Sequence, residues 1–138
     1  MPVRLLDIRE TPLDVAEVVA ALGSDAAGGL NLFIGTVRDH DEDRGVRGLG
    51  YSAHPTALAK LAQVAEAVAV RHGVDVAAVH RIGDLAIGDI AVIVATTAAH
   101  RAEAFAATRD LIDTLKAEVP IWKHQRFADG AEEWVGLP

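Results

Sequence analysis

The sequence of 138 residues contains no cysteine. This absence excludes disulfide bonds, thiolate metal ligands and cysteine nucleophiles. If the protein takes part in sulfur chemistry, the sulfur must therefore arrive on another molecule. The histidines show no metal-ligand spacing such as HExxH, so we expect no metal and no other cofactor.

Long apolar runs and excess positive charge are also missing. No run approaches the roughly 18 residues of a membrane-spanning helix. The N-terminus lacks the charged start and apolar centre of a secretory signal, and the net charge is −7. We therefore expect a cytoplasmic protein with no membrane or nucleic-acid partner, folded as a single domain over residues 1–138.

Lysine is scarce, with three lysines against ten arginines. Two of the three, Lys116 and Lys123, lie seven residues apart and flank a Val-Pro break. A lysine can lose its proton near neutral pH when its pKa is depressed, whereas an arginine remains charged. The pattern therefore favours a lysine placed for covalent or acid–base catalysis.

The hydrophobic periodicity predicts an α+β fold, with helices packed on a mainly antiparallel sheet. Thr11 and Pro12 are expected to begin the first helix, and residues 90–97 to form a central buried strand. Phe105, Ile112 and Leu115 are expected on the inner face of the last helix. Residues 39–45 read as a solvated hairpin connection rather than a functional lid, and 83–89 as a turn segment. Helices are expected at 13–22, 56–72 and 99–116, and strands at 3–8, 30–37, 46–52, 74–82, 90–97, 121–127 and 133–135.

Several cations lie at the ends of these elements. His100 and Arg101 open a predicted helix, where free backbone N–H groups attract anions, and Arg38 closes an apolar strand. Because Pro120 ends the helix, the chain can turn and bring Lys123 back near Lys116, and neighbouring ammonium groups lower each other's pKa. Each residue also has an explanation without function. Lys116 can be a cation that suits a helix C-terminus, and Lys123 an exposed strand position. The other cations can be ordinary surface or strand-end charges.

Four segments taken together resemble the large, catalytic subunit of molybdopterin synthase, the MoaE family. They are FIGTVRDH (33–40), VHRIGDLAIGD (79–89), AAHRAEAF (98–105) and LKAEVPIWKHQ (115–125). The similarity runs from about residue 3 to residue 135, in the order and spacing of the family.

The resemblance implies an α/β hammerhead-type fold with an additional small sheet, and a homodimer. It also implies a small ubiquitin-like partner of the MoaD type at each end, whose C-terminal Gly-Gly carries a thiocarboxylate. Sulfur from this partner would convert cyclic pyranopterin monophosphate (precursor Z), a pterin phosphate, to the dithiolene of molybdopterin.

By position, Lys116 and Lys123 match the two active-site lysines of the family. Substrate-binding positions of the family, some of them acting across the dimer interface, are matched by Arg38, His100, Arg101 and Phe33. The sequence departs from many relatives in Ser52-Ala53-His54 after Tyr51, in His124-Gln125 after Lys123, and in a short tail after Val135. The alternative function is a non-catalytic regulatory subunit that binds an anion or a carboxylate tail.

Overall fold

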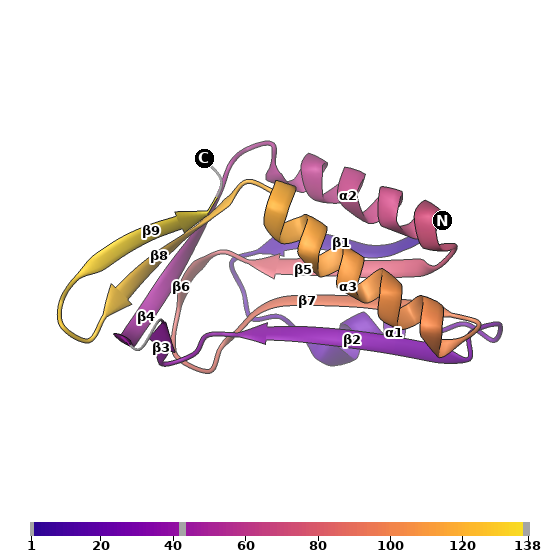
Figure 1. The fold of residues 1–138 in the computed structure, drawn as a ribbon, viewed down its shortest axis with the longest axis horizontal. Helices are drawn as coiled ribbons and strands as arrows, with labels where there is room; N and C mark the ends of the chain where they lie inside the picture. Colours follow the sequence, from indigo (N-terminus) through magenta and orange to yellow (C-terminus); the bar gives the residue numbers. More distant parts are fainter. Residues whose placement is uncertain (1, 42–43, 137–138) are drawn as a thin grey trace.

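The structure, a computed structural model, describes residues 2–41 and 44–136. Within these ranges the chain forms three helices and two sheets, as the α+β prediction requires (Figure 1). The predicted helices and strands agree with the structure to within two residues at each end. The elements are β1 (Val3–Arg9), α1 (Val15–Ala21), β2 (Gly29–Thr36), β3 (His40–Asp41), β4 (Arg44–Ala53), α2 (Ala57–His72), β5 (Asp75–Arg81), β6 (Gly83–Leu85), β7 (Ile90–Ala98), α3 (Arg101–Glu118), β8 (Ile121–Phe127) and β9 (Glu132–Gly136).

The first sheet has the strand order β1-β5-β7-β2, in which only the β1–β5 pair is parallel. Strand β7 lies inside the sheet and is buried from its second residue to its last. Its β-branched run suits a strand covered on both faces. The prediction of a central buried strand is therefore confirmed.

Alternate residues of β5 pack on opposite faces of this sheet. Val76 and Ala78 contact the core beneath α2 and α3, whereas Ala77 and Val79 contact the core beneath α1. Figure 1 shows α2 and α3 side by side over one face, with α1 behind the other. Because side chains alternate along a strand, His80 continues the face of Val76 and Ala78 and is directed to the side that carries α3.

Two predictions about helix details are wrong. Helix α1 is capped by Asp14, whose carboxylate accepts the backbone N–H of Ala16 at 2.9 Å, and Pro12 precedes the helix. Phe105 of α3 is 58% exposed, because the buried positions at three- and four-residue spacing are Ala104, Ala107, Thr108, Leu111 and Leu115. A neighbouring position on a helix is rotated by about 100°, which turns Phe105 away from this stripe.

The second sheet has the order β3-β4-β8-β9, and β6 also pairs with β4. The short strand β6 corrects the prediction of a turn over residues 83–89: Leu85 pairs with Leu49, and both are buried. The antiparallel pairing of β3 with β4 confirms the predicted hairpin connection, of which residues 42–43 lie outside the described residues. This sheet forms one end of the molecule (Figure 1).

Candidate active site

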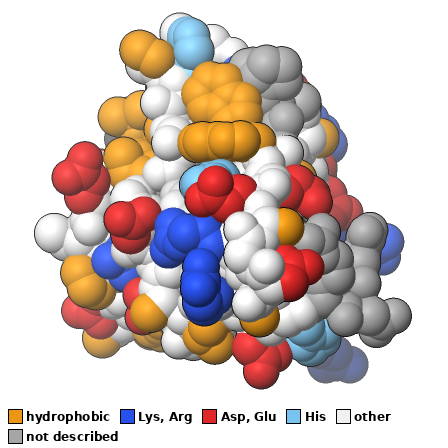
Figure 2. All heavy atoms as spheres, turned by 90° about the vertical axis from the view of Figure 1, so that its left-hand side faces the viewer, with side chains coloured by type: hydrophobic (Ala, Val, Ile, Leu, Met, Phe, Trp, Pro, Cys, Tyr) orange, Lys and Arg blue, Asp and Glu red, His pale blue; other side chains and the backbone are white. Residues whose placement is uncertain are grey.

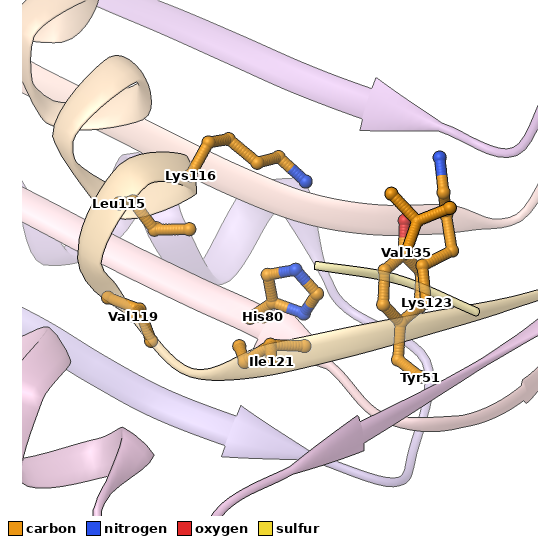
Figure 3. Close-up of a pocket in the computed structure, with 8 residues that line it drawn as sticks. All are labelled: Tyr51, His80, Leu115, Lys116, Val119, Ile121, Lys123 and Val135. Atoms are coloured by element: carbon orange, nitrogen blue, oxygen red, sulfur yellow. The ribbon is translucent and has the colours of Figure 1, made fainter. Parts of the chain in front are cut away.

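A pocket opens where the C-terminal end of α3 meets the second sheet. Its lining comes from five elements and the connection between α3 and β8, so residues far apart in sequence share one cavity. Figure 3 shows the lining residues: Tyr51, His80, Leu115, Lys116, Val119, Ile121, Lys123 and Val135.

The connection between α3 and β8 brings the two lysines together. Lys116 lies in the last turn of α3, and the backbone N–H of Val119 still bonds to the carbonyl of Leu115 at 3.0 Å. Val119 is extended, as residues before proline prefer, and Pro120 has no N–H to continue the helix. The chain therefore leaves α3 at once and enters β8 two residues later.

The register of β8 against β4 directs Lys123 into the pocket. Lys123 lies opposite Tyr51 in this antiparallel pair, and Trp122 lies opposite Ser52 on the other face. Directly opposed side chains share one face of a sheet, so Lys123 and Tyr51 are neighbours. The structure thus brings together both predicted catalytic lysines.

The Lys116 residue as a whole is exposed, but its ammonium reaches back over the Tyr51 ring, with Nζ 5.9 Å from the ring centroid. Protein atoms around this group desolvate the ammonium and lower the pKa of Lys116 below its usual 10.5, and the charge of Lys123 lowers it further. A lowered pKa increases the fraction of neutral amine, which is the form that accepts a proton or attacks an electrophile.

His80 forms the floor of the pocket and was not predicted as a site residue. It is 1% exposed, and its Nδ1 lies 2.7 Å from the carbonyl oxygen of Arg81. Because a carbonyl only accepts hydrogen bonds, Nδ1 must carry the hydrogen, and Nε2 is left as an acceptor. Burial, with a smaller effect of the Lys116 charge, lowers the pKa of His80 to about 4, so the imidazole is neutral at pH 7.

Tyr51 lies beside this histidine and beside both lysines. Its ring meets the His80 ring edge to face, with centroids 4.9 Å apart. Its sequence context, a short alternating strand, gave no sign of a pocket residue. Burial raises the pKa of the Tyr51 hydroxyl above its usual 10, so the group stays protonated over the physiological range.

Arg38 lies near the lysine end of the molecule but outside the pocket lining. Its guanidinium pairs with Asp41 at 3.1 Å, and Asp41 also accepts a hydrogen bond from Gln125 of β8 at 2.8 Å. The Gln125 hydrogen bond, followed by the charges of Lys123 and Arg38, lowers the pKa of Asp41. Arg38 is therefore connected to the surroundings of Lys123 through one carboxylate. Figure 2 shows the basic side chains gathered at the centre of this end of the molecule, with acidic side chains around them.

The structure does not bring His100 and Arg101 to the lysine pocket within one chain. Both lie at the opposite end of α3 from Lys116, a separation of about 24 Å along a helix that rises 1.5 Å per residue. His100 is the N-cap residue and makes no side-chain capping hydrogen bond. Phe33 lies on β2, is 42% exposed, and does not line the pocket.

In the described part of the chain, no group of three or more His, Asp or Glu side chains is arranged to hold a metal ion. No helix among the described residues is long and apolar enough to cross a membrane.

The geometry defines a class of protein: an α+β chain with a lysine-containing pocket where its helical layer meets a second sheet. The chain belongs to the MoaE family: the family model described as MoaE protein matches residues 8–118. It is 44% identical over 131 residues to molybdopterin synthase catalytic subunit 1 of Mycobacterium tuberculosis, covering 94% of this chain and 88% of that protein. The family is therefore one of enzyme subunits.

Two solved structures have the same fold. Molybdopterin synthase from Staphylococcus aureus superposes with a TM-score of 0.88 at 32% identity, covering 95% of this chain and 96% of the other. A complex of subunits 1 and 2 of molybdopterin-converting factor from Helicobacter pylori contains a chain with a TM-score of 0.69 at 22% identity, covering 99% and 90% of the two chains. At 22% identity, the similarity to the second structure shows a shared fold alone.

Proposed function

We propose that this chain is the catalytic subunit of a molybdopterin synthase. It transfers sulfur from the C-terminal thiocarboxylate of a small ubiquitin-like protein to cyclic pyranopterin monophosphate and so forms the dithiolene of molybdopterin. The observation that carries this proposal is that Lys116 and Lys123 line the same pocket and that the pKa of Lys116 is lowered.

The pocket suits a thin, anionic chain end. Lys116 and Lys123 supply positive charge, and the apolar Leu115, Val119 and Ile121 line the remainder. A Gly-Gly end has no side chains to fit, and its terminal thiocarboxylate is a negative group that the lysines attract. Since the chain has no cysteine, the sulfur must be carried by the partner, as this reaction requires.

In the proposed roles, the neutral amine of Lys116 either accepts a proton or attacks the acyl carbon of the tail after its sulfur has bonded to the pterin. In the second case a C–N bond forms, the acyl C–S bond breaks, the sulfur stays on the pterin and the amine loses its proton to solvent. The ammonium of Lys123 binds the negative charge of the tail. The lowered pKa of Lys116 supports its role, because a neutral amine is needed for either step. Arg38 is proposed to bind substrate from its place beside Asp41, 3.1 Å away, on the same end of the molecule.

His100, Arg101 and Phe33 are proposed to bind the pterin phosphate at a lysine pocket supplied by a second copy of the chain. This arrangement is supported by the length of α3, which separates them from their own Lys116. It is also supported by the outer strand of the first sheet, β2, whose large apolar side chains are exposed: Leu30, Phe33 and Ile34. Light scattering should give twice the chain mass of 14.5 kDa; a monomer at micromolar concentration would contradict the shared site.

Reconstitution tests the function. The purified chain is mixed with a thiocarboxylated small subunit and cyclic pyranopterin monophosphate, and dithiolene formation is measured. Lys60, the third lysine, pairs with Glu118 at 3.3 Å on the surface and provides a matched control, because Lys60→Ala should retain activity. If the chain binds the small subunit but forms no dithiolene, it is instead a regulatory subunit that holds a carboxylate tail.

A further inference from the structure

Tyr51 occupies a position between the two lysines that the proposed roles do not use. Lys123 is its cross-strand neighbour, and the Lys116 ammonium lies over its ring at 5.9 Å from the centroid. Figure 3 shows the Tyr51 hydroxyl directed toward the same side of the pocket as the two lysine nitrogens. The phenol therefore borders the space in which an anion held by both lysines would lie.

The Tyr51 hydroxyl is a hydrogen-bond donor that remains available to a ligand in the described part of the chain. Lysine ammonium groups only donate, and no hydrogen bond joins the Tyr51 hydroxyl to another residue within the described ranges. The raised pKa of Tyr51 keeps this hydrogen in place at pH 7. A bound oxygen or sulfur anion can accept this hydrogen bond.

The ring that carries this hydroxyl is held in a fixed position. His80 of β5 meets the ring edge to face, and Tyr51 also packs against the small apolar cluster of Val37, Leu49, Leu85 and Ala91. His80 is itself fixed by its hydrogen bond to the Arg81 carbonyl. A group that is held before the ligand arrives loses little freedom on binding.

We propose that the Tyr51 hydroxyl is a third binding group of the site and donates a hydrogen bond to the terminal anion of the partner's tail between Lys116 and Lys123. This inference rests on the proposed function for the identity of the tail. It assigns Tyr51 a positioning role: with two cations and one fixed donor, the carboxylate or thiocarboxylate can adopt only a narrow range of orientations.

Tyr51→Phe removes the hydroxyl and keeps the ring. The probes are a synthetic peptide ending in Gly-Gly with a free carboxylate and the same peptide ending in an amide, titrated calorimetrically into the full chain. The parent should prefer the carboxylate peptide, and Tyr51→Phe should lose about tenfold or more of that preference. Ser52→Ala, which removes the neighbouring hydroxyl on the opposite face of β4, should keep the preference. A parental preference in Tyr51→Phe, or a parent that does not distinguish the peptides, would overturn the inference.

A second measurement separates hydrogen bonding from a packing role. Tyr51 is the only tyrosine of the chain, so ultraviolet titration of tyrosinate reports this group alone. The carboxylate peptide should raise the pH at which Tyr51 ionises, because a bound anion stabilises the protonated phenol. Among the described residues that line the pocket, Lys116 of α3 and Lys123 of β8 are the titratable cations beside Tyr51, and His80 of β5 is neutral in this pH range. An unchanged titration on binding would refute the proposal.

The proposed reaction and the proposed role of Tyr51 can be refuted independently of each other. If Tyr51→Phe loses the carboxylate preference while the reconstituted parent forms no dithiolene, the role of Tyr51 stands and the proposed reaction falls. If the parent forms dithiolene and Tyr51→Phe matches it in both rate and peptide preference, the reaction stands and the role of Tyr51 falls.

Discussion

The buried imidazole of His80 should make the stability of the protein depend on pH in a defined window. In the folded protein the pKa of His80 is about 4, against the usual 6.5 expected after unfolding. Between these values the unfolded chain binds a proton that the folded chain does not, so unfolding becomes more favourable as the pH falls. The contribution of His80 to the free energy of unfolding is therefore fully present above pH 6.5 and is lost as the pH falls toward 4.

The difference of 2.5 pKa units sets the magnitude. Each unit corresponds to about 1.4 kcal/mol, so His80 alone should remove about 3 kcal/mol of unfolding free energy by pH 4. The carboxyls of Asp41 and Asp110 also have lowered pKa values. Their contribution is lost mainly as the pH falls below their usual 3.8, which separates it from that of His80.

The assay is urea unfolding at half-unit pH steps, followed by tryptophan fluorescence of the parent and of His80→Phe. The variant keeps a ring against Tyr51 but loses the hydrogen bond to Arg81, so it should be about 1 kcal/mol less stable at pH 7. Its stability should then decline much less than that of the parent between pH 6.5 and 4.5. His54→Gln, at an exposed position, serves as the control and should follow the parent.

The reasoning is refuted if the parent and His80→Phe lose stability in parallel over this window. Parallel curves would mean that His80 is protonated as easily in the folded protein as in the unfolded chain, and the description of a neutral pocket floor would then be wrong.

Four further variants test the remaining parts of the molecule. Lys116→Arg should bind the tail like the parent but lose most turnover in single-turnover reconstitution, because arginine is not deprotonated; parental turnover would make Lys116 an electrostatic group only. Lys116→Ala should lose turnover and also bind the tail more weakly. Arg101→Ala should weaken binding of the pterin phosphate by about 1.5–3 kcal/mol with a smaller effect at saturating substrate, and an unchanged Kd would remove it from the site. Leu111→Ala, at a position with 0% exposure, should cost about 2–5 kcal/mol in urea unfolding, and a smaller loss would indicate that the core collapses around the gap.

The elements were predictable because their signals are local. The β-branched run of β7, the glycine after α2 and the proline before β8 each act within a few residues. Gly73 indeed ends α2 in the left-handed region at φ 66°, where a side chain would be strained. The return of Lys123 toward Lys116 was likewise predictable, since Pro120 ends the helix and lets the chain turn back within a short segment. The face on which Lys123 lies depends on the β4–β8 register.

Features that depend on pairing between distant segments were not predictable in this way. Strand β6 is only three residues long and is defined by β4, more than thirty residues earlier in the chain. The roles of Tyr51 and His80 follow from the β4–β8 register and from the face of β5 that meets α3. The one available signal for His80 was a histidine continuing an apolar strand, which is uncommon without a partner inside the protein.

The brevity of the connection between α3 and β8 has a consequence for how the chain can vary in length. Only Val119 and Pro120 separate the two elements, and neither leaves slack between the helix end and the first pair of the strand. One added or deleted residue here would shift β8 by one position against β4 and exchange the faces of Lys123 and Trp122. An insertion would then put the indole of Trp122, and a deletion the imidazole of His124, where the pocket now has the ammonium of Lys123. At this junction the number of residues matters more than their identity, and insertions should accumulate in other loops.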